Sequence, residues 1–100
     1  VASVVRRETA IADVRDAGCA AAFIDGPDLA ERVAAQLDAA PVLAIDAVAG
    51  TAFGRLAATL ANGGVAVNYG GMSGEDLSIP DNIVIFNNVT VRGFWLSMAN

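Results

Sequence analysis

Short apolar runs alternate with segments of helical pattern along the chain, and this alternation limits the fold more than any other feature of the sequence. Apolar runs of strand type fall at 2–5, 21–24, 41–46, 65–69 and 89–98. Between the first four runs, apolar residues recur three or four positions apart, as they do in an amphipathic helix. Strand–helix–strand units with short connections form parallel sheets covered by helices on both faces. The sequence therefore predicts an α/β fold with a doubly wound parallel sheet.

Local signals indicate where two helices begin and which strand is most buried. Pro27 suits the first position of the helix after the second apolar run, and Thr51 suits the N-cap of the helix after the third. The run 41–46 is apolar with little alternation, which predicts a strand buried on both faces. The residues expected on the inward stripes of these two helices are Leu29, Val33 and Leu37, and Phe53, Leu56 and Leu60.

The charged residues and the single cysteine exclude several functions. The net charge of −5 argues against nucleic acid as the main partner, because neutralising phosphates needs a basic face. The chain has no His and only one Cys, Cys19, which rules out a Cys/His zinc site and a Ser-His-Asp triad within this chain. No apolar stretch reaches the roughly 20 residues that span a membrane. We therefore expect no metal site, no catalytic residue and no membrane partner here, and Cys19 fits a reducing compartment.

Two adjacent arginines follow the first strand, at the sheet edge where ligands of such folds bind. Arg6 and Arg7 can hold a phosphate through charge-assisted, bidentate hydrogen bonds. In a dinucleotide fold, Arg at this place accepts the 2′-phosphate of NADP, whereas an acidic residue binds the ribose of NAD. Two solvated surface charges are the alternative. Glu8, beside them, is interpreted as an anion at the start of a helix.

Three further stretches are expected at the same edge. Ala47 and Val48 are small enough to admit a flat ligand, or they make a tight strand-to-helix connection. The loop 69–72 would present backbone N–H groups and an aromatic wall to a ring or amide. Its Gly70 and Gly71 indicate either an ordinary turn or a place where a ligand approaches the backbone closely. At Gly93, before two aromatic residues, the strand is expected to bulge or to meet another backbone closely, and those aromatics also suit a core or an interface. They are Phe94 and Trp95.

The stretches VVRR, LAIDAVAG, NYGGM and IFNNVTVRGFWLS together resemble the nucleotide-binding domain of medium-chain dehydrogenase/reductases, in order and in spacing. The likeness covers nearly the whole chain. It is greatest to the NADPH-dependent enoyl thioester reductases of the mitochondrial type and their bacterial relatives. The resemblance implies that residues 1–100 form part of one NADP-binding Rossmann domain, from its second to its sixth strand. It also implies an oxidoreductase that reduces the 2,3-double bond of an enoyl-CoA or enoyl-ACP.

The resemblance also assigns roles by position. It implies that Arg6, Arg7 and Glu8 hold the adenosine 2′-phosphate, that the loop 69–72 lines the cofactor, and that residues 94–96 lie near the nicotinamide. It further implies catalysis without zinc and a homodimer paired through the edge strand, which begins at Val89 and ends at Leu96. The implied location is a bacterial cytoplasm or a mitochondrial matrix. The expected NADP-binding residues are Arg6, Arg7, Glu8, Ala47, Val48, Tyr69, Gly70, Gly71, Met72, Phe94, Trp95 and Leu96.

The chain lacks several parts of that family's pattern. It contains no G-x-G-x-x-G for the pyrophosphate, and the first strand of the domain and the catalytic domain, with its proton-transfer tyrosine, have no counterpart. In the strand order 3-2-1-4-5-6, the first strand lies between the second and the fourth, so its absence leaves two open edges in the middle of the sheet. We therefore expect a segment of a longer protein, or a gap filled by another chain, by swapped pairing or by a rearranged sheet. Alone, the segment should be inactive and should bind NADPH weakly.

Other classes of protein share the doubly wound sheet. A signalling receiver needs a Lys after its fifth strand, and this chain has no Lys. A methyltransferase usually carries an acidic residue after its second strand, where this chain has Arg6 and Arg7. An NADPH-dependent enoyl reductase is the leading interpretation. A quinone oxidoreductase or alcohol dehydrogenase-like member of the same superfamily is the nearest rival, followed by a non-catalytic α/β assembly fragment.

Overall fold

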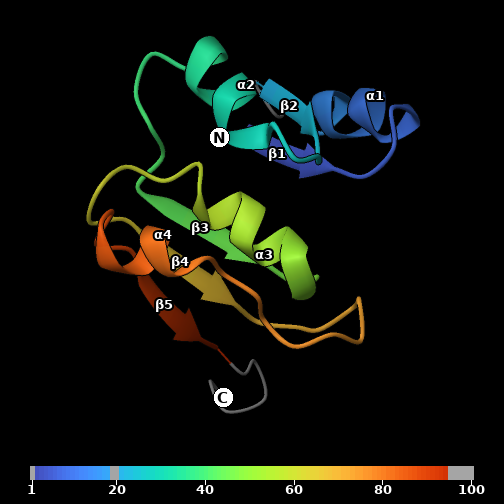
Figure 1. The fold of residues 1–100 in the computed structure, drawn as a ribbon. Helices are drawn as coiled ribbons and strands as arrows, with labels where there is room; N and C mark the ends of the chain where they lie inside the picture. Colours follow the sequence, from blue (N-terminus) through green and yellow to red (C-terminus); the bar gives the residue numbers. More distant parts are fainter. Residues whose placement is uncertain (1, 19–20, 95–100) are drawn as a thin grey trace.

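The computed structural model describes residues 2–18 and 21–94, and its strands and helices alternate as the sequence predicts (Figure 1). Trp95 and Leu96, expected near the nicotinamide, lie outside the described residues. None of the described helices has the length and apolar character needed to cross a membrane. The elements are β1 (Ala2–Val5), α1 (Thr9–Asp16), β2 (Ala21–Ile24), α2 (Leu29–Gln36), β3 (Leu43–Asp46), α3 (Gly50–Ala57), β4 (Val65–Asn68), α4 (Asp81–Ile85) and β5 (Thr90–Gly93).

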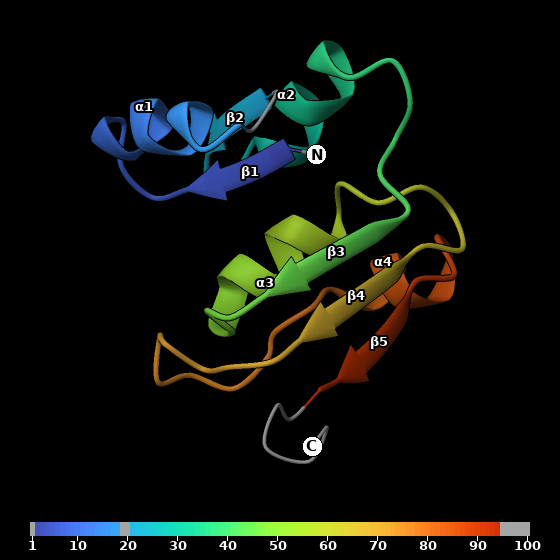
Figure 2. The same cartoon turned by 180° about the vertical axis from the view of Figure 1, so that it is seen from behind.

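The described strands form two separate parallel sheets. One sheet consists of β1 and β2, and the other has the order β3-β4-β5. Figures 1 and 2 show β1 and β3 as the facing edges of the two sheets, and a groove of ≈ 860 Å³ lies between them. This is the order of a Rossmann sheet without its first strand. The prediction of a partial doubly wound sheet with two open central edges is therefore confirmed.

The larger hydrophobic core lies between the β3-β4-β5 sheet and the helices α3 and α4, which cover one face of that sheet (Figures 1 and 2). Phe53 of α3 is buried in this core and is only 1% exposed. The sheet presents small side chains to this helix, which lets the two elements pack closely. The buried members are Ala44, Phe53, Ala57, Leu60, Ala66, Ile83 and Val89, with Leu56 partly buried against them.

A smaller core joins the β1-β2 sheet to α2. Its buried members are Phe23 of β2 and Leu29 and Val33 of α2, and Val4 and Leu37 are partly buried against them. The inward stripes predicted for α2 and α3 are therefore confirmed. Helix α1 packs against β1 and β2, while α2 also contacts α3 of the other half.

The prediction that β3 is buried on both faces is wrong, because the described helices cover only one face of the β3-β4-β5 sheet. Leu43 and Ile45 are 54% and 61% exposed, whereas Ala44 and Asp46 between them are buried. Side chains alternate between the faces of a strand, and α3 and α4 cover only the face of Ala44 and Asp46. No described helix covers the opposite face (Figure 2).

Two predicted helix starts and one predicted interface residue also differ. Pro27 precedes Asp28, the N-cap of α2, so it lies outside the helix. Thr51 lies in the first turn of α3, whose N-cap is Ala49, with a φ of 67°. Val89, expected in the subunit interface, precedes β5 and is buried in the larger core because it packs with the α3 and α4 residues there.

The segment after the 69–72 loop crosses α3 at two glycines. A Cβ added at Gly54 would lie 2.5 Å from the carbonyl oxygen of Ser78, and one at Gly50 would lie 2.7 Å from a carboxylate oxygen of Glu75. The N–H of Ser78 donates to the carbonyl of Gly50 over 3.2 Å. At Gly54 the neighbour is backbone, so only glycine allows the chain to cross the helix this closely there, whereas the Glu75 side chain at Gly50 could move aside.

Candidate functional site

The groove between β1 and β3 ends among residues from the carboxyl ends of three strands. Arg6 follows β1, Asp25 follows β2, and Asp46, Ala47 and Val48 close β3 and begin its loop. Parallel strands bring their carboxyl ends to one edge of a sheet, where ligands of these folds bind. Three of the predicted site residues, Arg6, Ala47 and Val48, are therefore brought together in one groove.

Arg6 and Arg7 keep their charges free. Both side chains are exposed, and neither takes part in an ion pair within the described residues. Glu8 is the N-cap residue of α1, but its side chain makes no capping hydrogen bond. Free guanidinium groups at a strand end can bind an anion, phosphate above all.

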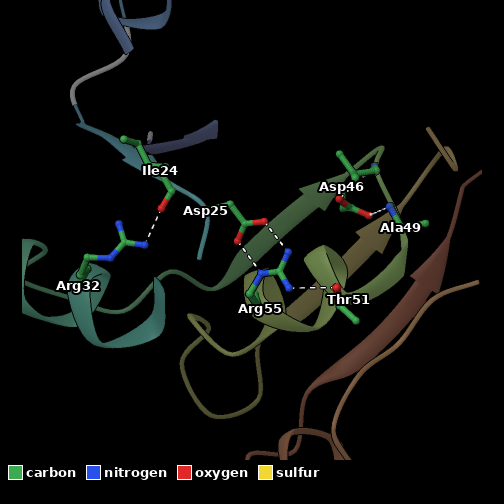
Figure 3. A network of polar contacts seen from close by, with 8 residues as sticks. Ile24, Asp25, Arg32, Asp46, Ala49, Thr51 and Arg55 are labelled. Carbon is green, nitrogen blue, oxygen red and sulfur yellow. Dashed lines mark hydrogen bonds and ion pairs between the residues drawn. The ribbon is translucent and has the colours of Figure 1, made fainter. Parts of the chain in front are cut away.

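Two other arginines, Arg32 and Arg55, form ion pairs, and that of Arg55 joins the two halves of the molecule. Arg55 of α3 donates two hydrogen bonds to Asp25, at 2.8 and 2.7 Å, and a third to Thr51 at 3.0 Å (Figure 3). The hydrogen bond from Arg55 holds the pKa of the Asp25 carboxyl below its ordinary value, and the same bond raises the pKa of Arg55. This pair ties the end of β2 to the larger half.

The loops after β3 and β4 are bonded to each other along their backbones. The N–H of Tyr69 donates to Asp46 over 2.9 Å, that of Met72 to Ala47 over 3.0 Å, and that of Ser73 to Val48 over 2.9 Å. The prediction that the 69–72 loop offers its N–H groups to a ligand is therefore wrong for Tyr69 and Met72, because the neighbouring loop already binds them. Their side chains are 52% and 81% exposed, so they can still form a wall.

The two glycines of this loop have different surroundings. A Cβ at Gly70 would lie 3.1 Å from the carbonyl oxygen of Ala47, so close contact between the two loops accounts for a glycine there. A Cβ at Gly71 would meet nothing within 4 Å, and neither glycine has a positive φ. Nothing in the described part of the chain accounts for Gly71, which leaves open space for a ligand beside its backbone.

Two polar residues that sequence reasoning missed hold this edge together. Asp46, only 6% exposed, accepts hydrogen bonds from the N–H groups of Val48 and Ala49 at 3.1 and 2.8 Å. Its third partner is the side-chain amide of Asn68, at 2.9 Å. The sequence does contain a signal for them: each of two neighbouring apolar strands ends in a single polar residue, Asp46 in β3 and Asn68 in β4.

The last strand reaches the same edge. The N–H of Phe94 donates to the carbonyl of Asn68 over 2.9 Å, which places Phe94 directly beside the end of β4. The Phe94 side chain is 48% exposed. The larger half therefore carries three exposed apolar residues, Tyr69, Met72 and Phe94, after the carboxyl ends of β4 and β5. Such a surface suits a flat ring or an amide.

A family profile described as zinc-binding dehydrogenase matches residues 1–100. The chain belongs to this family. Within residues 2–18 and 21–94, no three His, Cys, Asp or Glu side chains gather into a group that could hold a metal ion. The described residues therefore do not fit the zinc that the family's name implies.

Related proteins agree with this assignment. The mitochondrial enoyl-[acyl-carrier-protein] reductase of Dictyostelium discoideum is 47% identical over 57 residues, which are 57% of this chain and 16% of that protein. A structure of an Etr1p/NADP/crotonyl-CoA complex has a TM-score of 0.85 at 26% identity, and the Etr1p/Etr2p heterodimer of Candida tropicalis, a mitochondrial 2-enoyl thioester reductase, has 0.86 at 25%. Both cover 98% of this chain and 30% of the solved chain. The chain thus matches only a part of each relative's length.

Proposed function

We propose that this chain forms the cofactor-binding part of an NADPH-dependent oxidoreductase that reduces the 2,3-double bond of an enoyl thioester. One observation carries the proposal: Arg6 and Arg7 are exposed at the carboxyl end of β1, Arg6 lines the groove, and neither forms an ion pair with any described residue. A hydrogen bond to a charged group contributes about 1.5–3 kcal/mol. Two such groups can therefore separate NADPH, which has a 2′-phosphate, from NADH, which lacks it. The relatives that act on enoyl thioesters supply the substrate class.

The residues at the ligand edge fit the two ends of this cofactor. We place the 2′-phosphate at Arg6 and Arg7, with Glu8 beside it. The rest of the cofactor then crosses the carboxyl ends of β3 and β4. There it would meet Ala47 and Val48, the open backbone at Gly71, and the walls formed by Tyr69, Met72 and Phe94. Gly70, Trp95 and Leu96 stay predicted members of the site.

The chemistry divides between the cofactor and the protein. When bound, NADPH supplies a hydride to one alkene carbon of the substrate, and a proton is added to the other. The residues of this chain bind the cofactor, orient its ring against the Tyr69 and Phe94 side chains and exclude water from that face. We assign neither a proton donor nor a zinc ion to the described residues.

An assay of the protein at its natural length tests the reaction. Crotonyl-CoA should be reduced with NADPH, and kcat/KM with NADH should be lower by about tenfold to a hundredfold, as the charged contacts imply. A benzoquinone substrate serves as the comparison. Reduction of the quinone without reduction of crotonyl-CoA would favour the quinone oxidoreductase branch and contradict the substrate class. Equal rates with NADH and NADPH would contradict the role of the arginines.

We also propose that two copies pair through the edge of β5. This strand pairs only with β4 within the described residues, and it is exposed along its length, with Val91 39% exposed. Val91→Lys should convert a dimer into a monomer, as measured by light scattering, because it places a charge on a pairing edge. An unchanged dimer would contradict this interface. As the location we propose the mitochondrial matrix in a eukaryote, as in the Dictyostelium relative, or the cytoplasm in a bacterium.

A further inference from the structure

Asp46 is a buried acidic residue whose carboxylate is bonded only to uncharged groups. Asp46 is 6% exposed, and no cation within the described residues forms an ion pair with its carboxylate. The N–H groups of Val48 and Ala49 and the amide of Asn68 donate to it instead. Burying a carboxylate is costly, and charge-assisted hydrogen bonds offset that cost only while they keep their geometry. These hydrogen bonds therefore also fix the positions of the three donor groups relative to the carboxylate.

The backbone beside Asp46 has a conformation that alanine rarely adopts. Ala49 has a φ of 67° and a ψ of −159°, and its N–H is 2.8 Å from the Asp46 carboxylate (Figure 3). Placing a residue other than glycine in this region of φ and ψ costs about 1–3 kcal/mol, and the conformation persists only when the surrounding structure holds it. The Asp46 carboxylate accepts the N–H of Ala49 in this conformation and so helps to hold it. The shape of the loop after β3 thus depends on this side chain.

The Asn68 side chain extends the same control to the loop after β4. Its amide nitrogen donates to Asp46 at 2.9 Å and to the backbone carbonyl of Gly70 at 2.7 Å. The backbone carbonyl of Asn68, which any residue would supply, accepts from the N–H of Phe94 at 2.9 Å. Asp46 and Asn68 are register partners in β3 and β4. The two side chains therefore bond to each other and to the loops after β3 and β4, which carry ring-facing residues of the larger half.

We propose that Asp46 and Asn68 form a positioning pair that sets the loops of the ring-binding half of the site and leaves the phosphate-binding half at Arg6 and Arg7 untouched. The inference rests on the proposed function, because it concerns how that cofactor is held. Neither side chain needs to touch the ligand. A displacement of loops by about 1 Å changes binding and catalysis by up to about a hundredfold.

Two ligands separate the halves of the site in the protein at its natural length. NADPH uses both halves, and its Kd is measured by nicotinamide fluorescence. Adenosine 2′,5′-bisphosphate carries only the adenosine and phosphate end, and its Kd is measured by calorimetry. Asn68→Ala should raise the Kd of NADPH about tenfold to a hundredfold. The Kd of the bisphosphate should change by less than about twofold, because within the described residues neither Asp46 nor Asn68 hydrogen-bonds to Arg6 or Arg7, and sites without shared partners act nearly independently.

Asp46→Asn should act in the same direction, and the double variant should be no weaker than the stronger single variant, because residues in one hydrogen-bond network are not additive. If Asp46→Asn does not fold, Asn68→Ala carries the test, since Asp46 then keeps its bonds to Val48 and Ala49. Asp38→Asn and Asn62→Ala, both at exposed positions away from the site, are the matched controls and should change neither Kd.

The outcomes are distinct. A parallel rise of both dissociation constants, which general loosening of the fold would produce, overturns the positioning pair. Unchanged NADPH binding in Asn68→Ala overturns it as well. Wild-type protein that binds the bisphosphate and not NADPH, or neither ligand, would overturn the proposed function, and this inference with it. Selective loss of NADPH binding supports both.

Discussion

The half of the molecule built on β1 and β2 and the half built on β3, β4 and β5 differ in how well each can hold its own shape. Seven buried residues form the core around Phe53, whereas three form the core around Phe23. Since burial of apolar surface is the main stabilising term, the larger half has most of the stability. The smaller half relies on contacts with it, through α2 against α3 and through the ion pair between Asp25 and Arg55.

The two halves also present different surfaces to a ligand. The smaller half supplies exposed charge at Arg6 and Arg7, which no ion pair occupies in the part of the chain that the structure describes and which suits a phosphate. The larger half supplies neutral loops that Asp46 and Asn68 hold in one arrangement. Recognition of charge therefore lies on the less stable half, and the surface for a flat ring lies on the more stable one.

The largest expected effect separates the two cores. Phe53→Ala should lower the free energy of unfolding by about 5 kcal/mol and Phe23→Ala by about 3 kcal/mol, because the better-packed site leaves the larger unfilled cavity. Urea unfolding monitored by circular dichroism gives both values. Phe86→Ala is the matched control; this side chain is 79% exposed, so its loss should change stability by less than about 0.5 kcal/mol. A larger loss for Phe23→Ala than for Phe53→Ala would reverse the ranking of the halves.

The next effect tests the crossing of the chain over α3 in the larger half. Gly54→Ala places a Cβ 2.5 Å from the Ser78 carbonyl oxygen, so the backbone must shift. Overpacking of this kind costs about 1–3 kcal/mol. The melting temperature should fall accordingly, and hydrogen exchange should rise in the segment 73–80. Unchanged exchange there would show that this crossing does not fix the loop.

The contact between the halves should contribute less. Asp25→Asn should lower stability by about 1–2 kcal/mol, since the carboxylate side chain is 13% exposed and Arg55 is 33% exposed. Asp28→Asn is the control, because the ion pair of Asp28 with Arg32 is 59% and 35% exposed and should contribute under about 0.5 kcal/mol. Equal effects of the two variants would mean that Asp25 does not tie the halves together.

The same ion pair predicts a pH dependence. Arg55 holds the pKa of Asp25 below its ordinary value of 3.8, so the unfolded chain takes up the proton before the folded chain does as the pH falls. The stabilisation is therefore complete above the ordinary value and is lost as the pH falls below it through the lowered pKa. Urea midpoints measured from about pH 6 to about pH 3 should fall less steeply in Asp25→Asn than in the wild type. Parallel curves would contradict this cause.

The smallest effect on stability is expected at Gly71. Because a Cβ there meets nothing within 4 Å and the φ is not positive, Gly71→Ala should change the free energy of unfolding by less than about 1 kcal/mol. If a ligand lies against this backbone, the same change should weaken NADPH binding. Unchanged binding would mean that Gly71 belongs to an ordinary turn, the alternative that the sequence left open.

Much of the fold could be predicted because short-range signals agree with it. The ranges 2–5 and 21–24 match β1 and β2 to the residue, since charged residues follow each strand. The start of α3 could not be predicted in this way. The N-cap residue Ala49 has a positive φ and donates its N–H to the Asp46 carboxylate, and the sequence does not show that contact. The burial predicted for Leu43 and Ile45 is wrong because an apolar run does not reveal which face of the strand a helix covers.

In the candidate site, too, the features set by strand order could be predicted and those set by particular tertiary contacts could not. The meeting of Arg6 with Ala47 and Val48 was predictable, because parallel strands end at one edge. The contact between Asp46 and Asn68 was not, because 22 residues separate them and only the register of β3 with β4 brings them together. The prediction of free N–H groups on the 69–72 loop was wrong for Tyr69 and Met72 because the backbone of the neighbouring loop accepts their hydrogen bonds.

The most direct test of the central claim is the ratio of kcat/KM with NADPH to that with NADH, measured on crotonyl-CoA before and after Arg6→Ala plus Arg7→Ala. The wild-type preference should fall by about tenfold to a hundredfold, to near one, because the 2′-phosphate loses its partners. Arg15→Ala, an exposed arginine at the other end of α1, is the matched control and should keep the preference. A double variant that discriminates as the wild type does would contradict the assignment of this edge to NADPH.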